Sequence, residues 1–330
     1  MEIKGKEFNI LASGGDAQLG GKDIDGLLVE YFAEEFLREH TVDLRTEAYT
    51  HQDLWEKAEI AKKDLSFRNS VTPILSLEDK TLRVDLDRET FDDLIEDVVQ
   101  QTEDCLQSVI KSAGLDWSSI NTVLLAGGSS RIPAVKEMIE RVTGKAATRD
   151  MNPDECVAMG ASIQAILAIQ EKDGKTSTND VEGISDIVVH DIATHSLGVK
   201  ALASDHKTYI NSIIIPKFTR IPCEKAKIYA TGEDNQKKVE IEILQGEDEN
   251  PKSPEVEFIG KAGLKNLPPH KAGDLLIEVT LKYNADGVIE VVAKELQSGQ
   301  TNREIVMQKA SGLSDEIIEE KRKILTEHDL

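Results

Sequence analysis

The spacing of hydrophobic residues changes near residue 170 of this 330-residue chain. Before that point apolar residues recur at helical intervals between short apolar runs, and after it most segments alternate apolar and polar residues. A period of about 3.6 indicates an amphipathic helix, and a period of two indicates a half-buried strand. The pattern therefore predicts an α+β multidomain protein in which an α/β part precedes a strand-rich part.

The first half of the chain predicts five helices and two strands. A hydroxyl residue followed three positions later by an acid marks two of the helix starts. The helices are expected at 23–39, from Thr50, from Thr90 to Gly114, at 133–142 and from Asn152. EFNILA (7–12) and TVLLA (122–126) are the expected strands, and the second is continuously apolar, as in strands buried on both faces.

The second half predicts an antiparallel β-sandwich. KVEIEIL (238–244) alternates cleanly, and the segments 275–283 and 288–295 flank an Asn-Ala-Asp-Gly turn, which indicates a hairpin. With REIVMQK (303–309) they belong to a set of five to eight short strands separated by glycine and proline turns. A further helix is expected from Ser314, because acids occupy its first turn.

Composition narrows the partners and the compartment. A net charge of −22 repels phosphate backbones, so nucleic acid is not an expected partner. The three cysteines are far apart and there is no histidine cluster, which argues against disulfides and zinc and favours a reducing compartment. We find no signal peptide and no run of roughly 18 apolar residues, so we expect a cytoplasmic protein without membrane contact.

Two glycine-rich loops precede helices, where backbone N–H groups can meet a ligand. They are SGGDAQLGGKDID (13–25) and VLLAGGSSRIP (123–133), and each alone is more often an ordinary turn. Asp154 is explained by capping of the helix that follows it. Four polar residues share one helical face and suit either a clamp on a ligand or a solvated surface: Glu59, Lys62, Lys63 and Ser66.

Taken together, seven segments resemble the seventy-kilodalton heat-shock (DnaK-type) chaperone family, in the family's order and across nearly the whole chain. They are GGDAQLGGKDID, AEIAKKDLS, VLLAGGSSRIP, NPDECVAMGA, DIVVHDIATHSLGV, GEDNQKKVEIEILQGE and KASGLSDEI. The resemblance implies the second lobe of an actin-like ATPase domain at 1–172, a linker at 173–191, a peptide-binding β-sandwich at 192–312 and the start of a helical lid at 313–330. It implies a chaperone that binds extended apolar segments of unfolded proteins.

The resemblance also implies the residues of two sites. Contacts to ATP or ADP would come from Gly20, Gly21, Glu59, Lys62, Lys63, Ser66, Gly127, Gly128, Ser129, Arg131 and Asp154. Lys63 stands where many members have arginine, which keeps the charge and loses planar stacking on adenine. The peptide groove would be lined by Leu197, Val199, Leu202, Tyr229, Gly232, Val239 and Ile241, although sequence alone favours plain sandwich core for the apolar ones. Leu202 and Gly232 match the pair that arches over the peptide in some members.

The chain departs from the family pattern in having no first lobe, no DLGTT or DLGGGT phosphate loop and no catalytic lysine. Since those groups position the γ-phosphate and its metal, we assign no catalytic residue, and expect Mg²⁺ only with the missing lobe and negligible ATP turnover by this chain alone. Expected partners are unfolded polypeptides, a J-domain co-chaperone and a nucleotide exchange factor. Self-association is expected from an exposed strand edge near EFNILA.

Three other interpretations remain open from the sequence. The chain is a fragment of, or a partner in, a complete ATP-dependent folding chaperone; or it is a non-functional remnant or an acidic interaction scaffold; or it is a small-molecule kinase of the actin-like class. An upstream DLGGGT-coding sequence would favour the first and failure to fold cooperatively the second. The linker and the predicted sandwich argue against the third.

Overall fold

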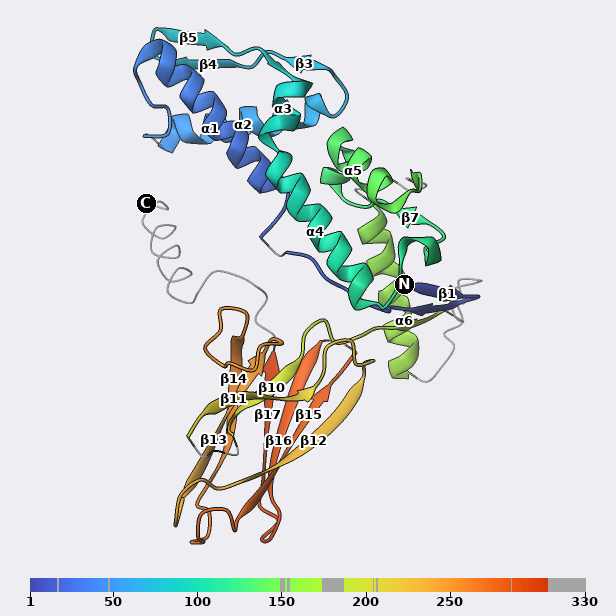
Figure 1. Cartoon of the computed structure of the whole chain (residues 1–330), viewed down its shortest axis with the longest axis vertical. Coiled ribbons are helices and arrows are strands. Elements are labelled where there is room, and N and C mark those ends of the chain that lie inside the picture. Colours follow the sequence, from blue (N-terminus) through green and yellow to red (C-terminus); the bar gives the residue numbers. More distant parts are fainter. Residues whose placement is uncertain are drawn as a thin grey trace. The chain divides into compact units, whose positions relative to one another are not determined.

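The structure of the chain is a computed structural model that describes residues 1–16, 18–46, 48–148, 152, 155–173, 187–203, 205, 207–285 and 287–307. The chain divides into two compact units. One unit comprises Gly14–Ile187, and the other comprises Met1–Ser13 with Val188–Leu330. The first is mixed α/β and the second is built from strands (Figure 1). The hydrophobic pattern predicts an α+β multidomain chain, and the structure confirms the coarser part of this prediction, a mixture of helices and strands.

Six α-helices and three small sheets form the described part of the first unit. The helices are α1 (Gly21–His40), α2 (Ala48–Leu65), α3 (Arg88–Leu94), α4 (Glu96–Ser112), α5 (Pro133–Thr143) and α6 (Cys156–Asp173). The strands are β3 (Ser70–Val71), β4 (Ile74–Leu77), β5 (Lys80–Arg83), β6 (Leu86–Asp87), β7 (Val123–Leu124) and β8 (Ala147–Thr148). Strand β3 pairs with β6 and β4 with β5, both antiparallel, and β7 pairs with β8 in parallel. Short 3₁₀ turns lie at Trp117–Ser119 and Gly128–Arg131.

One hydrophobic core holds this unit's first helices together. The predicted apolar stripe of α1 is confirmed, because Leu28, Phe32 and Phe36 are all fully buried at i+4 spacing. The stripe of α2 is confirmed in the same way by Leu54, Ala58, Ala61 and Leu65. Side chains from β4, β6 and α3 complete the cluster. This packing fixes the polar face of α2, which lies opposite its buried stripe.

Three predicted details of this unit are wrong. Helix α2 begins at Ala48, so Thr50 lies inside its first turn, where its buried hydroxyl donates to the carbonyl of Leu44. The helix expected from Thr90 to Gly114 is broken at Ile95 into α3 and α4, and Asp87 caps it by accepting a hydrogen bond from the Thr90 amide.

The third concerns TVLLA, of which only β7 is a strand, and Leu124 is 64% exposed. A continuously apolar run indicates burial on both faces only if packed layers cover both faces. In the described part of the chain, β7 has one partner strand and no layer covers Leu124. The last helix begins at Cys156, after a turn in which the Cys156 amide donates to the carbonyl of Asn152.

Two four-stranded antiparallel sheets make up most of the second unit. Their orders are β11-β10-β13-β14 and β12-β15-β16-β17. The strands are β10 (Leu197–Leu202), β11 (Tyr209–Ile215), β12 (Cys223–Ala230), β13 (Lys238–Gln245), β14 (Glu257–Lys265), β15 (Leu276–Tyr283), β16 (Val288–Glu295) and β17 (Thr301–Met307). Buried residues of both sheets belong to a single hydrophobic cluster. The predicted hairpin is confirmed, since β15 and β16 pair from Tyr283–Ile289 outward.

The strand expected at EFNILA is shorter than predicted and belongs elsewhere. Strand β2 (Glu7–Asn9) forms a hairpin with β1 (Glu2–Lys4) and a parallel pair with β9 (Val188–His190). The amides of Ile10 and Val188 donate to carbonyls across that pair, at 3.0 Å each. Residues 1–13 group with the strand-rich unit, because β2 forms backbone hydrogen bonds with β9.

Several predictions fall outside the described residues. They concern Asp154, the polar segment 174–186 of the predicted linker, and the predicted lid helix from Ser314. Across the described residues, no helix combines the length and apolar character that a membrane span requires.

Candidate functional site

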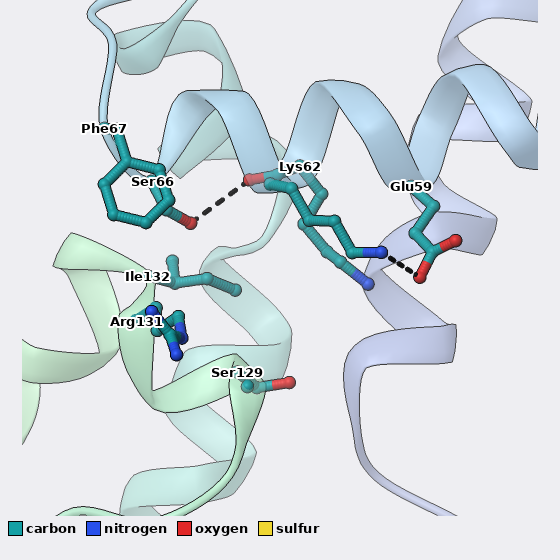
Figure 2. Close-up of a pocket in the computed structure, with 9 residues that line it drawn as sticks. Glu59, Lys62, Ser66, Phe67, Ser129, Arg131 and Ile132 are labelled. Carbon is teal, nitrogen blue, oxygen red and sulfur yellow. Dashed lines mark hydrogen bonds and ion pairs between the residues drawn. The ribbon is translucent and has the colours of Figure 1, made fainter. Parts of the chain in front are cut away.

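Two segments about 60 positions apart in sequence meet around one cavity of the α/β unit. The cavity has a volume of about 450 Å³, within the roughly 300–1,000 Å³ that ligand sites usually occupy. Figure 2 shows α2 on one side of it and the turn with Ser129 and Arg131 on the other. Its lining residues are Glu59, Lys62, Lys63, Ser66, Phe67, Gly128, Ser129, Arg131 and Ile132. Seven of them are predicted nucleotide contacts.

Helix α2 contributes the first wall of this cavity through its polar face. The spacing i, i+3, i+4, i+7 places Glu59, Lys62, Lys63 and Ser66 along one side, while the apolar stripe anchors the other side in the core. Ser66 follows α2 directly, and its hydroxyl donates to the Lys62 carbonyl at 3.2 Å. The sequence allowed two interpretations of this polar face, a ligand clamp or a solvated surface. In the structure the face borders a cavity.

Charge in the cavity opposes the charge of the chain. Three cations and one anion line it, in a chain of net charge −22. Lys63 Nζ lies 2.7 Å from Glu59 Oε1, and the hydrogen bond from Lys63 holds the pKa of the Glu59 carboxyl below its usual range. Glu59 therefore stays ionised at neutral pH and can accept hydrogen bonds from hydroxyl groups of a ligand.

The Gly-Gly turn after β7 forms the second wall. Gly127 has φ +82°, a conformation that side chains rarely adopt, and Gly128 opens the 3₁₀ turn. The Ser130 hydroxyl donates to the Gly127 carbonyl at 2.7 Å and stabilises the turn. Arg131 lies on this turn (Figure 2) and lines the cavity, and its Nη2 lies 3.5 Å from Asn152 Oδ1. The predicted strand-to-helix junction is present, with a 3₁₀ turn between β7 and α5.

Gly20 and Gly21 lie on a neighbouring cavity. It has a volume of about 1040 Å³, and Trp55, Leu94 and Val98 supply its apolar wall. Gly21 also touches the first site, because a Cβ added there would lie 3.0 Å from Ser129 Oγ and 3.2 Å from Lys62 Nζ. The structure thus brings Gly21, Lys62 and Ser129 to one point and leaves Gly20 one residue away from it.

The predicted peptide-groove residues divide by burial. Leu197, Val199 and Ile241 lie in the core cluster, while Tyr229 and Val239 pack partly buried against it. Leu202, at the end of β10, is 39% exposed, and a Cβ added to Gly232 would lie 3.1 Å from its Cδ1. The two predicted arch residues therefore meet, although Leu202 ends β10 and Gly232 lies two residues beyond β12, a strand of the other sheet.

Comparison with known families decides the identity of the chain. A family model described as Hsp70 protein matches residues 1–329. The chain belongs to the Hsp70 family. Members of that family are heat-shock chaperones that bind ATP, generally use Mg²⁺, and act on unfolded polypeptides together with co-chaperones.

Three residues in or beside the cavity of this Hsp70 chain were not predicted from its sequence as site residues. Phe67 follows α2 and places a ring, 73% exposed, at the edge of the cavity, and Ile132 lies opposite it. Asp25 lies behind Lys62 and contacts its ammonium group. An exposed aromatic carries no sequence signal, but a lone acid on the apolar stripe of a helix does, and it marks Asp25.

The described residues that line this cavity of the Hsp70 chain offer several groups for binding a ligand. The cavity combines an aromatic ring, an aliphatic side chain, a carboxylate and cationic groups, which suit a flat heterocycle joined to a hydroxylated sugar. No group of three or more His, Cys, Asp or Glu side chains is arranged to hold a metal ion within the described ranges.

Proposed function

We propose that the 450 Å³ cavity binds the adenosine part of ATP or ADP. The observation that carries the proposal is the convergence of seven predicted contacts, from two distant segments, on one cavity. Phe67, Ile132 and the Arg131 guanidinium would contact the base, while Glu59 and Lys62 would bind the ribose hydroxyls. The three cations favour an anionic ligand in spite of the chain's net negative charge.

Calorimetric titration with adenosine and ADP tests this proposal. Wild-type chain should bind both, and Glu59→Ala should weaken binding roughly tenfold or more, because a hydrogen bond to a charged group contributes about 1.5–3 kcal/mol. Asp53→Ala is the matched control: Asp53 pairs with Lys57 at i+4 in the same helix, as Glu59 pairs with Lys63, but does not line the cavity. Absence of binding to wild type, or equal losses in both variants, would contradict the proposal.

We further propose that the two four-stranded sheets form a peptide-binding β-sandwich that holds extended apolar segments of unfolded proteins. The meeting of Leu202 with Gly232 favours this function, because it joins the end of β10 to the segment just after β12, which belongs to the other sheet. Strand β12 lies at the edge of its sheet, so its outer backbone groups suit an added strand. Exposed Ile228 on β12 offers apolar contact at that edge.

The side chain of Leu202 is the most direct test of the peptide site. Leu202→Ser should weaken the binding of a fluorescent Leu-rich peptide roughly five- to thirtyfold, because apolar burial of about 1–2 kcal/mol is lost. Phe258→Ser is the control, since Phe258 is also exposed (49%) but lies on β14, two strands from β10. Fluorescence anisotropy measures both variants, and a peptide that binds neither wild type nor variants would refute the proposal.

A further inference from the structure

The ammonium group of Lys62 is held by a second residue that does not line the cavity. Lys62 Nζ lies 2.7 Å from Asp25 Oδ2 and 2.9 Å from the carbonyl oxygen of Gly21. The two side chains are only 13% and 12% exposed, whereas the neighbouring Lys63 and Glu59 side chains are more than half exposed. The pair links α1 to α2, so it fixes Lys62 relative to both helices.

These contacts leave one donor of Lys62 for the cavity. A lysine ammonium carries three N–H groups, and Asp25 and Gly21 accept from two of them. No described residue accepts from the third. Because Lys62 lines the cavity, that third N–H is available to an oxygen atom of a bound molecule.

Fold stability alone gives a poor account of Asp25. The residue is 8% exposed and shares the buried face of α1 with Leu28 and Val29. Its second oxygen, Oδ1, is buried and has no hydrogen-bond partner among the described residues. A buried acceptor without a donor destabilises a fold, and apolar residues often replace a buried ion pair without loss of stability. A role through Lys62 explains why a carboxylate stands here.

We propose that Asp25 is a positioning residue of the nucleotide site. It holds the Lys62 ammonium with one N–H directed at an oxygen of the ribose or phosphate of an adenine nucleotide. Asp25 itself makes no contact with the ligand, and its effect passes through Lys62. This inference rests on the proposed nucleotide binding.

The experiment compares four forms of the whole 330-residue chain by calorimetric titration with ADP: wild type, Asp25→Asn, Lys62→Met and the double variant. Asp25→Asn should weaken ADP binding roughly tenfold, because the charged partner of Lys62 is lost. In the Lys62→Met background the same change should have no further effect, since residues that act as one unit are not additive. A merely structural role of Asp25 would weaken binding in both backgrounds. Melting temperatures measure stability separately.

Two further variants sharpen the result. Asp53→Asn removes the acid of the Asp53–Lys57 pair on the same helix and should leave ADP binding unchanged. Asp25→Glu keeps the charge on a longer stem and should give an intermediate affinity even if Asp25→Asn fails to fold. Wild type that does not bind ADP overturns both the proposed function and this inference. Wild type that binds, with unchanged affinity in Asp25→Asn or additive losses in the double variant, overturns this inference alone.

Discussion

Gly21, the first residue of α1, lies against both walls of the proposed nucleotide site. The position leaves little room for a side chain, because an added Cβ would lie against Ser129 Oγ and Lys62 Nζ. Gly20, one residue earlier, has φ −176° and no atom within 4 Å of an added Cβ. A side chain at Gly21 would therefore collide with its neighbours, whereas a side chain at Gly20 would not.

Replacement of each glycine by alanine tests this difference. Gly21→Ala should lower the affinity for ADP roughly tenfold, because the added methyl displaces the tips of Lys62 and Ser129. Both neighbours are ends of flexible side chains, so the fold should survive. Calorimetry measures the affinity and circular dichroism the fold.

Gly20→Ala serves as the control and should change the affinity less than twofold. Any residue can adopt its extended backbone, and its methyl would meet open space. If the two variants weaken ADP binding equally, close packing at Gly21 is not the reason for its effect.

At the scale of elements, α2 forms one wall of the proposed nucleotide site and is anchored at its end by Arg88. Arg88 Nη2 donates to the carbonyls of Leu65 and Arg68, which lie at and just beyond the end of α2. The last carbonyls of a helix have no N–H partner within the helix. The Arg88 side chain, from the start of α3, supplies the missing donor. The contact fixes the segment that presents Ser66 and Phe67.

Loss of this anchor should destabilise the α/β unit. Arg88→Gln should lower its free energy of unfolding by about 1–3 kcal/mol, because two carbonyls lose a charged donor. Calorimetric melting should show a shift of a few degrees. Arg83→Gln removes the same charge from an exposed position on β5 and should leave the melting temperature nearly unchanged. Equal shifts in both variants would assign the effect to charge rather than to the anchor.

The pairing of β2 with β9 shows how weakly short strands are specified by sequence. Each strand has three residues, and the parallel pair joins positions 7–9 to positions 188–190. So short a pattern contains too few alternating positions to select a partner. The alternation of β15 and β16, eight residues each with a turn signal between them, was enough to predict their hairpin.

At the scale of the whole molecule, two separate hydrophobic clusters account for two units. One cluster joins both four-stranded sheets, and the other joins α1, α2, α3 and the strands around them. The net charge of −22 does not predict the local charge of the cavity, which is lined by three cations and one anion. Net charge describes the long-range field of the whole chain and says nothing about one local pocket.

The sequence by itself determined the mixed α/β class, the apolar stripes of α1 and α2, the β15–β16 hairpin and, through its motifs, membership of the Hsp70 family. Those features depend on local periodicity or on many residues at once. Only the tertiary structure decided that Glu59 and Arg131 share a cavity, that Asp25 holds Lys62, that Leu124 is exposed and that residues 1–13 pair with β9. Each of these depends on which distant surfaces pack together, and spacing along the chain does not carry that information.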